Sequence, residues 1–161
     1  MKTDQSQLND PRLAGFWTRR DVLTDEEKVV VAQVEKWFEY YAADPDRMTY
    51  ELYSDDMRLV IYDGPNATAN TQDGHNVLPT QKSLSDFEKR VKAKVPRRYF
   101  RRDRLIVSGN IATVQFALID PDRPGWELPC CSLLTFRGDK IISEQAYLNI
   151  AAWPGAVPET T

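Results

Sequence analysis

Two side chains of this sequence have the type and setting needed to move protons, Asp63 and His75. Asp63 follows the apolar residues Leu59 and Ile61 at intervals of two, so the three share one face of a strand. A carboxyl group at the end of an apolar wall has a raised pKa and can act as a general base. His75, the single histidine, lies in the polar segment TQDGHNV and titrates near neutrality. We expect the base to be one of these two.

Each of these two residues also has a purely structural interpretation. Asp63 precedes Gly64, and Asp-Gly pairs form turns in which the aspartate bonds its own backbone. His75 has the composition of a solvated loop around it. If Asp63 forms only the turn, the base has to be sought at His75, Asp103 or Glu144.

Tyrosines are the expected proton donors, because a phenol can stabilise a developing oxyanion. Tyr40 and Tyr41 end a helical pattern, and Tyr147 lies in the last strand-like segment. We expect Tyr40 or Tyr147 to be catalytic, although aromatic residues at helical spacing usually pack in a core. Arg101 and Asp103 are spaced to form an ion pair inside the pocket. The other expected pocket residues are apolar or hydrogen-bonding side chains: Trp37, Tyr41, Phe87, Phe116, Trp126, Ser132 and Leu134.

The sequence offers no pattern for a metal or a cofactor. The two cysteines, Cys130 and Cys131, are adjacent, and neighbouring strand residues point to opposite faces. One histidine excludes a two-histidine metal site. Phosphate-binding and dinucleotide-binding motifs are missing. We therefore expect no metal and no cofactor.

Composition predicts a cytoplasmic globular protein. The net charge is −3, with 21 basic and 24 acidic residues, which gives no general attraction to nucleic acid. Five arginines lie between residues 96 and 104, but a strand would divide them between two faces. No apolar run approaches the ~20 residues that cross a membrane. The N-terminal residues lack the apolar core of a signal peptide.

The elements that position these residues change from helical to strand-like along the chain. Thr24 to Glu27 form a capping box, and apolar residues at helical spacing continue to Ala43. A short helix follows over 46–53 and a strand over 57–62. A long loop over 64–82 contains one short strand near 76–80. A third helix, capped by Ser83 or Ser85, ends at Pro96.

The remainder of the chain predicts four strands in an antiparallel meander, because short turns with Gly and Asn or Asp separate them. These strands cover 99–107, 111–119, 126–136 and 140–150. Residues 1–23 form an N-terminal arm, 24–150 the domain and 151–161 a tail. Helices that precede a run of strands indicate an α+β fold.

This order resembles the nuclear transport factor 2-like superfamily, which includes SnoaL-like and ketosteroid-isomerase-like domains. The segments that carry the resemblance are VVVAQVEKWFEYYAAD, YELYSDDMRLVIYDG and CCSLLTFRGDKIISEQAYLNI. The resemblance covers about residues 24–150. It implies a cone-shaped, curved antiparallel sheet wrapped on three helices, a cystatin-like α+β barrel, with a pocket between the sheet and the first and third helices.

The resemblance also bears on chemistry. Asp63 looks similar to the strand-end aspartate of ketosteroid isomerases, and Ser132 falls where those enzymes place an oxyanion-binding acid. Serine is a weaker donor than a protonated acid, which argues against that isomerase reaction. The closing-strand aspartate of limonene epoxide hydrolases falls on Ala146.

Three functions follow from the resemblance. The first is a cofactor-independent lyase, isomerase or cyclase acting on an apolar, aromatic or polycyclic small molecule. The second is the non-catalytic β subunit of an aromatic-ring-hydroxylating dioxygenase, with the arginine cluster as the subunit interface. The third is a small-molecule binding module, whose pocket would hold no ionisable group with a perturbed pKa. We also expect a homodimer through the sheet, with Leu133, Ile142 and Leu148 facing outward.

Overall fold

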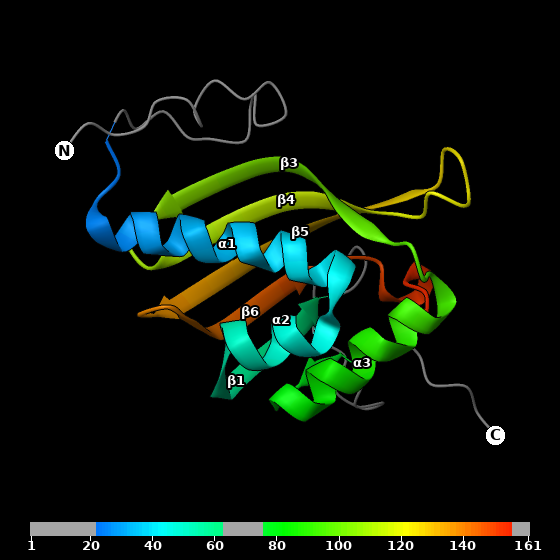
Figure 1. Ribbon diagram of the computed structural model, residues 1–161, viewed down its shortest axis with the longest axis horizontal. Coiled ribbons are helices and arrows are strands. Elements are labelled where there is room, and N and C mark those ends of the chain that lie inside the picture. The colour runs from blue at the N-terminus through cyan, green and yellow to red at the C-terminus, as the bar shows by residue number, and fades with distance from the viewer. Residues whose placement is uncertain (1–21, 63–75, 156–161) are drawn as a thin grey trace.

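The computed structural model describes residues 22–62 and 76–155. Within these ranges three α-helices lie on one side of a curved sheet (Figure 1). The expected α+β architecture is confirmed, with an apolar core between the helices and the concave side of the sheet.

Helices α1 (Asp25–Ala43) and α2 (Pro45–Leu52) follow each other with one residue between them. The predicted capping box is present: Thr24 Oγ1 accepts a hydrogen bond from the Glu27 N–H, and Glu27 Oε2 accepts one from the Thr24 N–H. Asp44 ends α1 and caps α2, because its Oδ1 accepts bonds from the backbone of Asp46 and Arg47. One aspartate therefore turns the chain between the two helices.

Helix α3 (Gln81–Lys94) starts earlier than expected. The prediction that Ser83 or Ser85 caps it is wrong, because Thr80 is the capping residue and Ser83 completes a capping box with it. Ser85 is buried and donates a hydrogen bond to Asp46, which ties α3 to α2. Ser85 lies one turn inside the helix, so it does not mark the start of α3.

The strands are β1 (Tyr53–Tyr62), β2 (Val77–Leu78), β3 (Tyr99–Ser108), β4 (Ile111–Ile119), β5 (Glu127–Arg137) and β6 (Lys140–Tyr147). Their order in the sheet is β2-β1-β6-β5-β4-β3. The predicted meander of β3 to β6 is confirmed. However, β1 runs parallel to β6, so the sheet is mixed. No hairpin joins these two strands, so no tight turn sets their relative direction.

The end of β6 also differs from the prediction. The strand stops at Tyr147 instead of reaching residue 150. Asn149 then caps a single 3₁₀ turn, η3 (Ile150–Ala152), by accepting a bond from the Ala152 N–H. The chain therefore bends back toward the helices at this point (Figure 1).

Glu27 connects the start of α1 to the sheet. Its side chain is buried, and Oε1 accepts a hydrogen bond of 3.1 Å from the Gly109 N–H in the turn between β3 and β4. Its other oxygen completes the capping box. One carboxylate thus fixes where α1 begins relative to the sheet that it covers.

We predict that Glu27→Ala lowers the free energy of unfolding by about 1–3 kcal/mol, because it removes the capping box and the hydrogen bond to the partly buried Gly109 N–H. Glu26→Ala, at the exposed neighbouring position, should change it by less than about 0.5 kcal/mol. Urea unfolding of both variants measures the difference. Equal stabilities of the two variants would show that Glu27 does not hold α1 to the sheet.

Candidate active site

A small pocket lies between the three helices and the sheet. Its free volume is about 30 Å³, enough for one or two water molecules. Most of its wall is apolar or aromatic, with Leu59 and Ile61 from β1, Leu84 and Phe87 from α3, and Phe116 from β4. The polar side chains that interrupt this wall are Tyr41, Tyr53, Glu88, Ser132 and Glu144.

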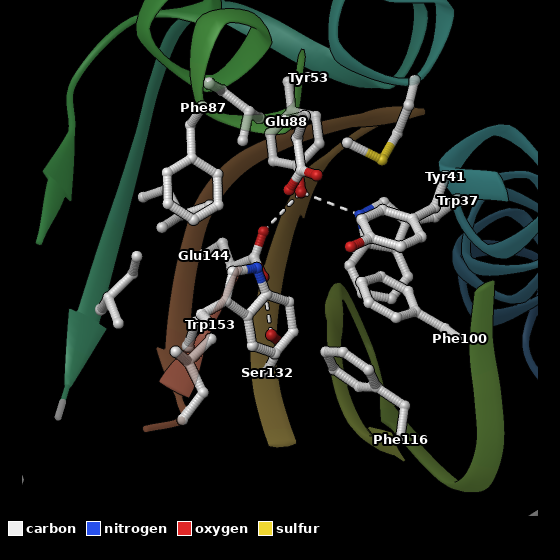
Figure 2. A pocket seen from close by; sticks show the side chains of 16 residues that line it. Trp37, Tyr41, Tyr53, Phe87, Glu88, Phe100, Phe116, Ser132, Glu144 and Trp153 are labelled. Carbon is white, nitrogen blue, oxygen red and sulfur yellow. Dashed lines mark hydrogen bonds between the residues drawn. The ribbon is translucent and has the colours of Figure 1, made fainter. Parts of the chain in front are cut away.

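Glu144 is the centre of a buried hydrogen-bond network (Figure 2). Ser132 Oγ donates to its Oε1 at 2.7 Å, and Tyr53 Oη donates to its Oε2 at 2.5 Å. Trp37 Nε1 in turn donates to Tyr53 Oη at 3.0 Å. Both carboxyl oxygens therefore have a partner, and the network fixes the orientation of the group.

Strand register explains why these residues meet. In the β5–β6 pairing, Ser132 lies opposite Ala146 and Leu134 lies opposite Glu144. Residues two apart share a face, so Ser132 and Glu144 point to the same side of the sheet. Tyr53 comes from the first position of β1, immediately after α2. The end of α2 therefore places the Tyr53 phenol beside the Glu144 carboxyl group.

Burial dominates the electrostatics of this network. Glu144 is 4% exposed, and loss of solvent raises its pKa above the ordinary value, although the bonds from Ser132 and Tyr53 act to lower it. Burial, and then the charge of Glu144, raise the pKa of Tyr53 well above its ordinary value. Tyr53 therefore stays protonated and donates. Glu144 can hold or release a proton in an apolar setting.

A second carboxyl group, Glu88 of α3, lies in the same pocket. Its partner is Arg98, whose Nη2 lies 3.3 Å from Glu88 Oε2 and whose side chain is fully buried. Burial raises the pKa of Glu88 to about 7; the Arg98 charge lowers it, and the Glu144 charge raises it. Figure 2 shows both carboxyl groups and the Tyr53 phenol gathered in one part of the pocket.

Tyr41 brings a hydroxyl group to the same pocket. Its ring stacks on Phe100 with centroids 3.4 Å apart, and the Arg98 guanidinium lies over the ring at 4.2 Å. Its Oη is buried and makes no hydrogen bond within residues 22–62 and 76–155. Burial and the Glu88 charge raise its pKa, against a lowering by Arg98. Tyr41 is thus a neutral donor without an acceptor.

Five of the predicted pocket residues line this cavity: Trp37, Tyr41, Phe87, Phe116 and Ser132. Asp63 and His75 lie outside the described residues, so their roles stay predictions. Leu134 is fully buried in the core and Trp126 packs beneath Arg123 at 4.2 Å; neither lines the pocket.

The two tyrosines predicted to be catalytic lie elsewhere. Tyr40 is buried against Arg47, whose guanidinium lies 4.2 Å from its ring. Tyr147 is 42% exposed and stacks on Tyr62 at 5.1 Å. Glu144 and Ala146 point inward, so Tyr147 points outward by strand alternation. Neither lines the pocket.

The arginine and the leucine expected on particular faces also need correction. Arg101 does pair with Asp103, and with Glu127, but these side chains are about two-fifths exposed and lie outside the pocket. Phe100 takes the inward position of β3, which turns Arg101 outward. Leu148, expected on the outer face, lines the pocket instead.

Sequence reasoning missed Tyr53, Glu88 and Arg98, and it named Glu144 only as a substitute base. For Glu88 a signal existed. It lies four residues after Leu84 and three before Val91, on the apolar face of α3, and a charged residue there has to be buried. For Tyr53 and Arg98, whose positions depend on how β1 and the α3–β3 turn pack, no local pattern existed.

Within residues 22–62 and 76–155, no cluster of three histidine, cysteine or acidic side chains could hold a metal ion. No helix in the described part of the chain is long and apolar enough to span a membrane.

Comparisons with known proteins agree with this fold. A family model for the SnoaL-like domain matches residues 34–144, which is more than half of the chain. No curated protein matches the sequence significantly.

Several solved structures share the fold at low sequence identity. A provisionally assigned SnoaL-like polyketide cyclase from Jannaschia sp. CCS1 is 15% identical, with a TM-score of 0.64, over 88% of this chain and all of that one. A phenazine biosynthesis-related protein from Pseudomonas aeruginosa is 13% identical, with a TM-score of 0.61, over 85% and 91%. A protein with a ketosteroid isomerase-like fold from Catenulispora acidiphila is 18% identical, with a TM-score of 0.58, over 80% and 97%.

We predict that the Glu88 carboxyl group titrates with a pKa of about 7. Carbon-13 NMR of the glutamate carboxyl carbons should show one such transition, which Glu88→Gln removes. The raised pKa stabilises the fold below pH 4.5. This contribution, up to about 3 kcal/mol, is lost as the pH rises from 4.5 through 7. If every glutamate has finished titrating well below pH 6, the assignment is wrong.

Proposed function

The chain belongs to the SnoaL-like domain family, and from this premise we propose that it is a cofactor-independent acid–base enzyme. Its reaction would be that of a lyase, isomerase or cyclase on an apolar, aromatic or polycyclic small molecule. The observation that carries the proposal is the buried Glu144 carboxyl group, held by Ser132 and Tyr53 in a largely apolar pocket.

Glu144 serves as the general base in this proposal. A carboxylate with a raised pKa is a stronger base than an exposed one, and it removes a proton from carbon next to a carbonyl group. The bonds from Ser132 and Tyr53 hold its oxygens in place, so little reorganisation is needed during transfer. Trp37 orients Tyr53 through its own hydrogen bond.

Removal of that proton places negative charge on the carbonyl oxygen, which then needs a donor. Tyr41 Oη is a neutral, buried donor that lines the same pocket and makes no hydrogen bond within the described ranges. Glu88, with a pKa of about 7, can return a proton to a second carbon atom near neutral pH. Glu144 thus removes the proton, Tyr41 stabilises the negative charge on the oxygen, and Glu88 returns a proton.

The related structures support this class of reaction through what their descriptions say of those proteins: a provisionally assigned polyketide cyclase and a protein related to phenazine biosynthesis. Both descriptions concern ring-containing compounds, which suit a pocket walled by Trp37, Phe87, Phe100 and Phe116.

The other two functions have less support. A simple binding module would hold no perturbed ionisable group, whereas the pKa values of Glu88 and Glu144 are both raised. An interface for a dioxygenase α subunit would use the arginine cluster. However, Arg97, Arg101 and Arg102 pair with acidic residues of their own chain. We therefore place the acid–base enzyme first.

We predict that the protein accelerates exchange of protons next to the carbonyl group of cyclic aromatic ketones, such as tetralones, in D₂O. Proton NMR follows the loss of signal directly. Glu144→Gln should slow the catalysed exchange by about 10² or more. Glu26→Gln, at an exposed position, should leave it unchanged. Equal rates for wild type and Glu144→Gln would remove Glu144 from the mechanism.

We also propose a homodimer through the outer face of the sheet. This face carries a stacked aromatic pair, Tyr62 and Tyr147, and the exposed side chains of Ile106 and Ile111. Leu133 is partly buried on the outward side of β5. Apolar groups gathered on one face favour association.

Light scattering should give a mass near twice 18.5 kDa at micromolar concentration. Tyr147→Lys should shift the protein toward monomer, because a charge enters an apolar contact. Val29→Lys, at a site equally exposed on α1, should not. A wild-type monomer under these conditions would contradict the proposal.

A further inference from the structure

The pocket as it stands is too small for the proposed substrate. Its free volume is about 30 Å³, whereas a protein cavity known to bind benzene has a volume of about 150 Å³. A side chain that lines the pocket therefore has to move before a ring compound enters.

Trp153 is the side chain best placed to move. Nearly all the other lining residues lie on helices or strands that hydrogen bonds hold in place. Trp153 lies after β6, on residues 149–155, which we call the C-terminal strap. Its indole ring is 5% exposed and, as Figure 2 shows, lies among the side chains that line the pocket. The ring is larger than benzene, so its withdrawal would open enough space.

The strap is held at its far end by a close approach to α3. Arg90 Nε donates a hydrogen bond of 3.2 Å to the Gly155 carbonyl oxygen. Gly155 has φ of +68°, and a Cβ atom built on it would lie 2.6 Å from the Arg90 carbonyl oxygen. Only glycine allows the strap to dock at this distance. Within the strap, Asn149 caps one 3₁₀ turn, and Ile150 packs into the core.

Among residues 22–62 and 76–155, the closed strap offers no acceptor to one buried donor. Trp153 Nε1 is buried and has no hydrogen-bond partner within the described residues. A buried donor without an acceptor is costly. The closed strap is therefore less stable over an empty pocket than it would be with that donor satisfied. Closure over a ligand that offers an oxygen acceptor would satisfy this donor, and the ligand would then favour the closed state.

We propose that the C-terminal strap is the entrance to the pocket, and that Trp153 Nε1 donates a hydrogen bond to an oxygen acceptor of the bound ring compound when the strap closes. This deepens the proposed function, on which it rests, by naming the substrate class as ring compounds that carry a carbonyl or ether oxygen. Pure hydrocarbons of the same shape would bind less well.

The entrance is tested by releasing the strap without touching the pocket. In Gly155→Ala the new methyl group collides with the Arg90 backbone. Solvent exchange of the Trp153 indole N–H, measured by NMR and assigned by its loss in Trp153→Phe, should become about tenfold faster or more. Gly138→Ala is the matched control, because Gly138 has a φ of +62° and no atom lies within 4 Å of the new Cβ. In this variant the exchange of the Trp153 indole N–H should be unchanged. Equal exchange in the two alanine variants would overturn the entrance.

The donor is tested with two probes of the same shape, acetophenone and ethylbenzene, which differ in one carbonyl group. Wild type should prefer acetophenone, and Trp153→Phe should reduce this preference by about 3- to 10-fold while it still binds both compounds. A preference that is unchanged in Trp153→Phe overturns the role of the indole but leaves the proposed enzyme intact. If neither probe shifts any pocket resonance, the pocket proposal fails and this one fails with it.

Discussion

The carboxyl group of Glu144 lies where its charged form has lost almost all contact with water, and two hydroxyl groups replace that water. Desolvation raises its pKa, while the bonds from Ser132 and Tyr53 favour the charge. This balance constrains the rest of the structure. To supply Tyr53, Ser132 and the supporting Trp37, the helix α1 and the strands β1 and β5 must converge on β6. In this arrangement β1 pairs with β6 in parallel.

A second buried charge makes the pocket chemically asymmetric. Glu88 has an arginine partner and a pKa of about 7, whereas the donors to Glu144 within the described part of the chain are the neutral hydroxyl groups of Tyr53 and Ser132. Pairs of titratable groups in different environments are what acid–base enzymes use to hold one group as acid and the other as base. The apolar walls strengthen both effects, because electrostatic interactions are stronger in surroundings of low polarity. The fold thus supplies a small, largely apolar pocket, and a few polar residues give it reactivity.

Local sequence patterns were sufficient to predict most helices, strands and turns. They were not sufficient to predict strand direction or which side chains face the pocket. The capping box at Thr24 and the turns at Gly109 and Gly138 each depend on neighbouring residues, and each is found as expected. The direction of β1 and the facing of Glu144, Tyr147 and Leu148 depend on contacts between distant segments. Alternation along β6 groups Leu148 with Glu144 and Ala146, but it does not tell which of the two faces packs against the helices, and the expectation that Leu148 faces outward is therefore wrong. Asp63 and His75 stand out as candidate bases because the residues next to them in the sequence suggest their surroundings. The surroundings of Glu144 come from three other elements, α1, β1 and β5, and cannot be recognised from its sequence neighbours.

The proposed mechanism depends on Glu144 being a buried carboxyl group with a raised pKa inside the pocket. Infrared difference spectroscopy between wild type and Glu144→Gln isolates the stretching band of its protonated form. We predict that this band is present and that it disappears with a midpoint above the ordinary 4.5 of a glutamate as the pH rises. A midpoint at or below 4.5 would contradict the account, because it would mean that the carboxylate is solvated or paired with a cation and is no stronger a base than any surface glutamate.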